Sequence, residues 1–268
     1  MPEPIIFYDI PGNAAKDKAW SPNTSEAFLR FNLNIKGIPY RTVWVEYPDI
    51  APLSKRIGAE PTTTNPDGSG SPHYTLPAIY DPNTRTAVAE SLAIARYLDR
   101  TYPSSGPTLI SKETDALHMA FVQAFRDAYL PDAGQLFLPA SCTQLNPGSE
   151  AYFRRTRETW YNAKLEDFAP VGSEKRAQHW KGVEKALHTI KEWLEADGTE
   201  KMNVMGDRIS FADIVVVSHL VWMRLVLGPA SEEWTDVMKW DGGHWARFMA
   251  GFGKWETVDV GTEVEAEV

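Results

Sequence analysis

Residues 74–102 read YTLPAIYDPNTRTAVAESLAIARYLDRTY, and this stretch combines a hairpin with a helix. The apolar residues of 76–80 predict a short strand, and Asp81-Pro82-Asn83 predicts a turn. The run 85–89 then predicts a second strand that pairs back on the first. A helix follows from Glu90-Ser91, because apolar residues recur there at three- and four-residue spacing. The stretch therefore predicts a β-β-α unit.

Two features of this unit can work together in binding. A cis bond before a proline occurs at about one in twenty such bonds, so it usually has a reason. With a cis bond before Pro77, Leu76 would offer its N–H and C=O to a bound peptide. Ser91 stands at a helix start, where free N–H groups and the helix dipole favour a carboxylate, and Glu90 suits an ammonium group. Together these groups describe a receptor for a small zwitterionic peptide.

Taken alone, Pro77 is typical of an edge strand, and Glu90-Ser91 is typical of the start of a helix. At this spacing the pair resembles the glutathione-binding half of the glutathione transferases, in which a cis-proline hairpin leads into a Glu/Gln-Ser helix start. The resemblance implies glutathione as co-substrate. The residues implied to bind it are Thr75, Leu76, Pro77, Glu90 and Ser91.

Composition agrees with such a protein. The 268 residues carry a formal charge of −9, which argues against nucleic acid or an anionic membrane as a partner. No apolar run reaches membrane length, and residues 1–8 lack the pattern of a signal peptide. The single cysteine, Cys142, excludes an internal disulfide and suits a reducing cytoplasm. We expect a cytoplasmic protein without a metal site.

The first part of the chain predicts the order β-α-β-α-β-β-α, which matches the thioredoxin-like half of the transferases. The segments that precede the hairpin are a strand at 4–8, a helix at 25–36, a strand at 41–45 and a short helix at 49–58. Residues 60–72 form a polar loop that departs from the family pattern and reads as an insertion. It would reshape how the glycine end of glutathione is held. Lys55 or Arg56 would pair with that glycine carboxylate, unless each is only a solvated surface charge.

Beyond Pro103 the strand signals largely stop. Helices are predicted at 112–130, 149–168, 173–196 and 210–227, with a weaker set near the end. We therefore expect an α/β fold joined to an all-α one: a thioredoxin-like glutathione-binding domain at 1–103 and a helical-bundle domain at 104–268. The fourth helix has a capping box, Ser210 to Asp213, which is a structural signal without a catalytic role. The acidic tail from Glu256 is expected to fray.

The glutathione thiol has a pKa near the value of about 8.5 for free cysteine, so a transferase must stabilise its thiolate. A hydroxyl that donates to sulfur near a helix N-terminus would do this. Ser21, just ahead of Pro22 and the first helix, is the predicted stabiliser, and Asn23 is the second candidate. The alternative is an ordinary helix cap followed by proline. Tyr8, at the end of the first strand, competes for the role, whereas Cys142 is predicted to be inert.

The stretch from Tyr8-Asp9 to Ser21-Pro22 and the segment 158–167 resemble one serine-type branch of the superfamily, over residues 4–256. This branch holds the bacterial lignin β-etherases and, nearest in appearance, the etherase-like fungal transferases. The resemblance implies a homodimer that detoxifies wood-derived aromatic compounds, by conjugation or by cleavage of aryl ethers. Peroxide reduction stays open.

A small hydrophobic aromatic ligand is the expected second substrate, in a cleft between the two domains. Trp20, Phe125 and Tyr129 are the predicted lining residues, although core packing is the alternative for each. Two further hypotheses remain. One is a binding protein that stores polyphenols without turnover, and the other is a non-enzymatic adaptor, against which Pro77 and Glu90-Ser91 argue.

Overall fold

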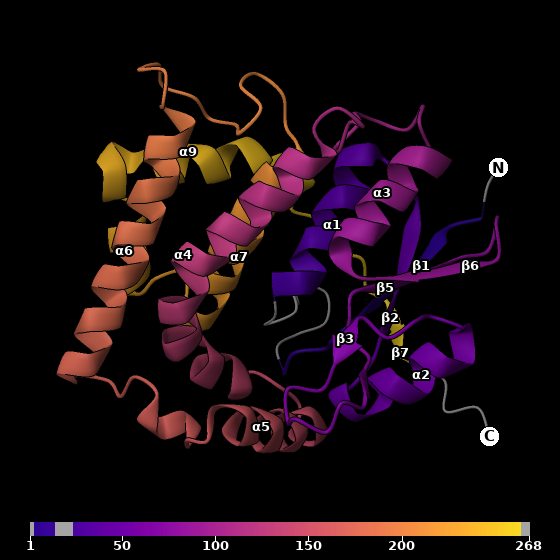
Figure 1. Cartoon of the computed structure of the whole chain (residues 1–268), viewed down its shortest axis with the longest axis horizontal. Helices are drawn as coiled ribbons and strands as arrows, with labels where there is room; N and C mark the ends of the chain where they lie inside the picture. Colours follow the sequence, from indigo (N-terminus) through magenta and orange to yellow (C-terminus); the bar gives the residue numbers. More distant parts are fainter. Residues whose placement is uncertain (1–2, 14–23, 264–268) are drawn as a thin grey trace. The chain divides into compact units, whose positions relative to one another are not determined.

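The computed structural model describes residues 3–13 and 24–263, with only the backbone of 24–27 (Figure 1). The chain forms two compact units. The first holds residues 1–108, 144–162 and 255–268, and the second holds 109–143 and 163–254. The predicted division after residue 103 makes each domain one continuous segment, whereas these units alternate along the chain.

A five-stranded sheet forms the centre of the first unit, in the order β6-β5-β1-β2-β7. Its strands are β1 (Ile5–Asp9), β2 (Tyr40–Trp44), β5 (Ala78–Asp81), β6 (Thr86–Ala89) and β7 (Thr262–Glu263). β1 runs parallel to β2, which requires a crossover, and α1 (Thr24–Lys36) supplies it. β5 pairs antiparallel with both β1 and β6, so the predicted hairpin forms.

Helices α1 and α3 (Ser91–Thr101) lie side by side on one face of this sheet (Figure 1). Alternate residues of a strand point to the same face, and residues four apart on a helix share a stripe. The resulting apolar core of the unit contains Ile5, Phe7, Leu29, Leu33, Ile38, Ile79, Ile94, Tyr97 and Leu98. The predicted thioredoxin-like domain is confirmed.

The segment between β2 and β5 carries a short 3-10 turn, η2 (Tyr47–Asp49), and α2 (Ile50–Ile57). The polar stretch that follows contains a small hairpin of β3 (Thr63–Thr64) and β4 (Pro72–His73). Backbone bonds from Thr62 N to His73 O (3.0 Å) and from Asn65 N to Ser71 O (2.9 Å) close it. The segment read as an insertion is therefore hydrogen-bonded structure.

The second unit is helical, as predicted. Its helices are α4 (Asp115–Cys142), α6 (Glu174–Leu194), α7 (Phe211–Leu227), α8 (Glu232–Val237) and α9 (Trp240–Phe252), with a 3-10 turn η3 (Leu165–Asp167). α4 packs against α6 and α7. Where α4 meets α6, a Cβ added at Gly182 would lie 2.0 Å from a carboxylate oxygen of Asp132, so the Asp132 side chain would have to move. None of the described helices is long and apolar enough to cross a membrane.

The predicted end of the α4 helix at Leu130 is wrong, because the helix continues through Pro131 and Pro139 to Cys142. A proline inside a helix removes one backbone hydrogen bond and disfavours the helix locally. Packing outweighs this cost here, since Leu136 and Phe137, between the two prolines, are buried. The capping box of α7 is present as predicted, and Asp213 also accepts from the backbone N of Val204 at 2.6 Å.

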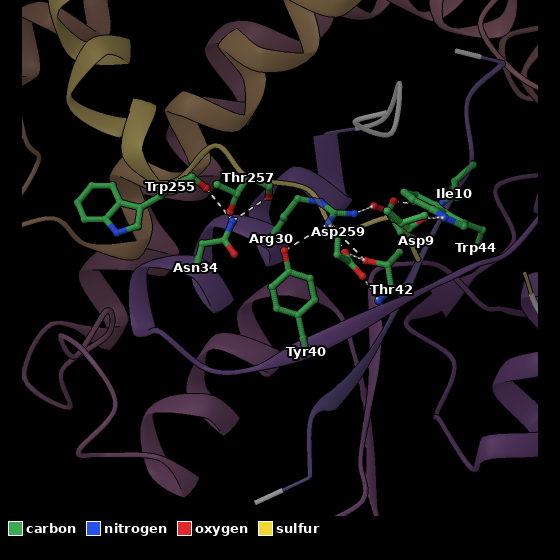
Figure 2. A network of polar contacts seen from close by, with 11 residues as sticks. Asp9, Ile10, Arg30, Asn34, Tyr40, Thr42, Trp44, Trp255, Thr257 and Asp259 are labelled. Carbon is green, nitrogen blue, oxygen red and sulfur yellow. Dashed lines mark hydrogen bonds and ion pairs between the residues drawn. The ribbon is translucent and has the colours of Figure 1, made fainter. Parts of the chain in front are cut away.

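The expectation that the tail frays from Glu256 is wrong for residues 256–263. This segment makes contacts with α1 and β2 (Figure 2) and ends in β7, which pairs with β2 as the edge strand of the sheet. Asn34 Nδ2 donates to the carbonyls of Trp255 (2.7 Å) and Thr257 (3.1 Å). Trp44 Nε1 donates to the carbonyl of Val260 at 3.0 Å.

A buried arginine explains why the acidic tail is held. The side chain of Arg30 is 0% exposed, and its Nη2 donates to Asp9 Oδ2 at 2.5 Å. Its Nη1 donates to Asp259 Oδ1 at 3.1 Å (Figure 2). Asp259 also accepts from the backbone N of Thr42 at 2.8 Å and from the Thr42 hydroxyl. Acidic composition predicts a solvated tail, but this partner lies 229 residues away in sequence.

Replacement of Asp259 by alanine should destabilise the first unit. The change leaves Arg30 buried with one carboxylate fewer and removes an acceptor from Thr42, so we expect a loss of about 1–3 kcal/mol in the free energy of unfolding. Urea denaturation followed by fluorescence measures it. Val260→Ala is the matched control, since that side chain is 67% exposed and its contact to Trp44 is through the backbone. Equal midpoints for the two variants would show that the Asp259 carboxylate adds no stability.

Candidate functional site

The peptide bond between Leu76 and Pro77 is cis, as the sequence suggested. Leu76 is buried and lies two residues before the start of β5. The carbonyl of Pro77 accepts from the backbone N of Glu90 at 3.2 Å. The hairpin thus holds the two predicted binding elements, the proline bend and the start of α3, within one hydrogen bond of each other.

Glu90 caps its own helix. Its carboxylate accepts from the backbone N of Leu92 (3.0 Å) and of Ala93 (2.9 Å), and the Ser91 hydroxyl donates to it at 3.2 Å. The backbone of Glu90 has a φ of 77°, in the region that side chains rarely adopt. The N–H groups expected to hold a substrate carboxylate therefore already bind a carboxylate, which shows that this helix start suits one.

A pocket of about 380 Å³ opens in the first unit. Of the predicted glutathione-binding residues, Thr75 and Leu76 line it, while Pro77, Glu90 and Ser91 do not. The remaining described walls come from the end of β1, the η2–α2 segment, the β3–β4 hairpin and α5 (Pro147–Tyr161). The pocket thus lies at Leu76 and is lined in part by the β3–β4 hairpin, which belongs to the segment that the sequence presented as an insertion.

The described pocket walls combine aromatic and apolar side chains with polar ones. Tyr47, Tyr74 and Tyr152 line it together with Ile10 and Ile50. The rings of Tyr47 and Tyr152 stack with centroids 6.0 Å apart and an interplanar angle of 14°. Rings paired in this way gain energy beyond their buried area, so this stack stiffens one wall of the pocket.

One wall carries Arg157, which sequence reasoning missed. Its guanidinium lies over the rings of Phe153 (4.1 Å), Trp160 (4.5 Å) and Tyr47 (5.3 Å). Phe153 and Trp160 are four and three residues away on α5, so helical spacing alone would have put all three side chains on one face. The ring of His73 meets Trp160 edge-on at 5.6 Å. Burial, and then the charge of Arg157, lowers the pKa of His73, so this ring is neutral at pH 7.

α5 is fixed in the first unit by polar contacts around Glu46. Asn146 Nδ2 donates to the Glu46 carboxylate at 2.7 Å, and the hydroxyl of Ser149 donates to the same carboxylate. The backbone N of Tyr47 donates to Ser149 Oγ at 2.8 Å. The start of α5 thereby holds the η2 turn that carries Tyr47, and this fixes two walls of the pocket at once.

Three predicted site residues, Trp20, Ser21 and Asn23, fall outside the described residues, and several others do not line the pocket. Lys55 is exposed on α2, with its ammonium 5.6 Å from the centre of the Tyr74 ring. Tyr8 is buried within β1 and does not line the pocket, and burial raises the pKa of its phenol.

Phe125 and Tyr129 lie in the core of the second unit. Both are 0% exposed, and their rings stack with centroids 5.3 Å apart. The ring of His219 contacts both, at 4.7 Å from Phe125 and 5.2 Å from Tyr129. This is the core packing that was the alternative for each, and their contact with substrate stays a prediction.

Within the described residues, Glu195, Glu200 and His244 form one group of potential metal ligands, with ligand atoms within 4.8 Å of one another. Glu195 already pairs with Lys191 at 2.5 Å and Glu200 with Arg247 at 2.7 Å. Because two cations offset the two carboxylates, the group carries little net charge to attract a metal ion.

Comparison with known families agrees with this geometry. The family model described as glutathione S-transferase, N-terminal domain, matches residues 27–101, and the model of the C-terminal domain matches residues 116–255. The chain belongs to the glutathione S-transferase family. A glutathione S-transferase-like protein of Aspergillus flavus, ustS, is 30% identical over 265 residues, which cover 94% of this chain and 91% of the relative.

Solved fungal transferases are more similar. A glutathione S-transferase of Ceriporiopsis subvermispora, CsGST63524, solved in complex with glutathione, is 53% identical with a TM-score of 0.91; the match covers 96% of this chain and 99% of that one. The glutathione transferase GSTFuA3 from Phanerochaete chrysosporium is 44% identical with a TM-score of 0.88, over 97% of this chain and all of that one. The predicted family and two-part fold are therefore confirmed.

Replacement of Ser91 by alanine should weaken glutathione binding about tenfold. The reason is that the hydroxyl predicted to donate a hydrogen bond to a carboxylate of glutathione is lost. Titration calorimetry with reduced glutathione measures the dissociation constant. Ser104→Ala, at an exposed serine of the same unit, is the control and should bind like the original protein. An unchanged affinity in Ser91→Ala would remove Ser91 from the site.

Acidification should destabilise the second unit through His219. Burial lowers the pKa of this ring to about 4, whereas the unfolded chain takes up a proton near 6.5. The unfolded state therefore binds more protons between these values, and stability falls as the pH falls through this window. One pKa unit corresponds to about 1.4 kcal/mol, so the loss approaches roughly 3 kcal/mol.

Between the folded and unfolded pKa values of His219, the free energy of unfolding of the His219→Gln variant should depend less on pH. This holds whether the variant is more or less stable than the original protein. His188→Gln is the control, because that side chain is 57% exposed and Asp241 raises the pKa of its ring. A plot for His219→Gln as steep as that of the original protein would show that other groups cause the acid sensitivity.

Proposed function

We propose that this glutathione transferase activates the thiol of glutathione as a thiolate and directs it at an electrophilic carbon of a hydrophobic aromatic substrate. The observation that carries the proposal is the pairing, in one unit, of the Leu76–Pro77 and Glu90–Ser91 elements with an aromatic-walled pocket that Leu76 itself lines. Glutathione, which is bound in the similar structure from Ceriporiopsis subvermispora, is the co-substrate.

In the proposed step the thiol first loses its proton to solvent. The thiolate then attacks the carbon, a C–S bond forms, and the bond to the leaving group breaks. When the substrate is an aryl ether, the leaving group departs with the electron pair as a phenolate and is released as a phenol. Ser21 stabilises the sulfur charge by donating a hydrogen bond, with Asn23 as second candidate, and no covalent bond to the enzyme forms.

The substrate class follows from the pocket walls and from the resemblance to the etherase-like branch. Tyrosine rings beside apolar side chains suit a planar aromatic compound. We propose that wood-derived aromatic compounds are detoxified in this way by a homodimer in the cytoplasm. Analytical ultracentrifugation tests the dimer, and a sedimentation coefficient of a single chain would exclude it.

A second candidate function is storage of aromatic or polyphenolic ligands without turnover. The same aromatic walls favour it, since binding needs the pocket and not the thiolate. Liquid chromatography of a mixture with glutathione and an aryl ether distinguishes the two functions. A conjugate or a released phenol supports the transferase, and tight binding without product supports storage.

Replacement of Ser21 by alanine should lower turnover about 10²-fold, the typical cost of one lost donor to a developing or stabilised anion. It should also remove the thiolate absorbance that appears in the ultraviolet difference spectrum when glutathione binds at neutral pH. Glutathione affinity should change little, which separates activation from binding. If turnover and the thiolate signal both persist, Asn23→Ala and Tyr8→Phe identify the true donor.

A further inference from the structure

The pocket at Leu76 contains a charge that the proposed reaction does not use. Among its described lining residues, Arg157 is the one with a permanent charge. His73 also lines the pocket, but its lowered pKa leaves it neutral. None of these described lining residues carries a carboxylate, so no negative charge in the wall offsets the guanidinium. Such a pocket favours a ligand with one negative charge.

Arg157 is held in place before any ligand binds. Three aromatic rings lie within 5.3 Å of its guanidinium carbon, and Nη1 donates to Thr156 Oγ1 at 2.9 Å. In the described part of the chain no carboxylate forms an ion pair with it. Ring faces stabilise a cation, but they leave most of its N–H groups able to donate elsewhere.

We propose that Arg157 binds a carboxylate of the ligand in this pocket and makes the protein select acids over their neutral esters. The inference rests on the proposed function. A guanidinium matches a carboxylate with two parallel hydrogen bonds. Two sources supply this chemistry: the glycine end of glutathione, laid along Leu76, or an acid group on the aromatic substrate.

Arg157 suits this role better than Lys55, which the sequence offered for the glycine carboxylate. Lys55 is exposed on α2 and does not line the pocket. A long lysine side chain in solvent loses more freedom on binding than a guanidinium that is already packed. We therefore place the selection for a carboxylate on α5.

The test compares acids and esters in matched variants. Arg157→Gln removes the charge. Arg155→Gln is the control, because Arg155 is an exposed residue on the same helix, 5.4 Å from the Tyr152 ring, and does not line the pocket. The ligand pairs are glutathione with its glycine ethyl ester, and 4-hydroxycinnamate with its methyl ester. Calorimetry gives the four dissociation constants for each protein.

If the glycine end is the source, Arg157→Gln weakens glutathione about tenfold or more and leaves its ester unchanged. If the aromatic substrate is the source, the same loss appears for 4-hydroxycinnamate and not for its ester. Arg155→Gln changes neither pair. Equal effects on acid and ester in both pairs, or no effect in either, overturn the proposal.

Arg157→Lys keeps the test valid if Arg157→Gln fails to fold. Lysine retains the charge but lacks the planar pair of N–H donors of the guanidinium, so it should keep part of the preference for the acid. A preference for the acid equal to that of arginine would contradict binding through two hydrogen bonds. The proposed function fails separately, when the original protein neither binds glutathione nor shows thiolate absorbance. The 4-hydroxycinnamate pair then still decides the role of Arg157.

Discussion

The first unit depends on the buried guanidinium of Arg30. A cation taken out of water costs several kcal/mol unless its partners are close and well aligned, and one carboxylate satisfies only part of a guanidinium. Asp9, at the end of β1, supplies the first partner, and Asp259 supplies the second from the far end of the chain. Because Asp259 also binds Thr42 on β2, the charge connects the helix, two strands and the tail. Removing Asp259 would take away one of the two carboxylates that pair with Arg30.

The structural features that the sequence predicted correctly are those specified by residues close together in the chain. The hairpin, the turn and the helix of 74–102 are specified by proline, by turn residues and by apolar spacing within thirty residues, and they formed as expected. The capping box at Ser210 is likewise specified by residues close in sequence. The path of α4 through Pro131 and the docking of residues 256–263 depend instead on tertiary packing or on partners more than two hundred residues away. No pattern along the chain encodes such contacts.

The same division applies to the site. The proposal of Leu76, Pro77, Glu90 and Ser91 as binding residues could be made from the sequence, because one supersecondary unit carries them all, and it stays a prediction. The position of Arg157 at a pocket could not be predicted from the sequence. It depends on α5 lying against the turn at Tyr47, and Glu46 makes that contact with the start of the helix. Local spacing predicts the aromatic stack on α5, but only the fold shows that a pocket opens beside it.

The alternation of the two units along the chain has a consequence for biosynthesis. Arg30 leaves the ribosome early, whereas Asp259 lies 229 residues later, and synthesis at about 5–20 residues per second separates them by roughly 10–45 s. During this interval β2 is an open edge strand, which can pair with other chains. The whole of the second unit is made before the first can close. We therefore expect nascent chains to need protection by chaperones, and truncated chains that lack Asp259 to aggregate.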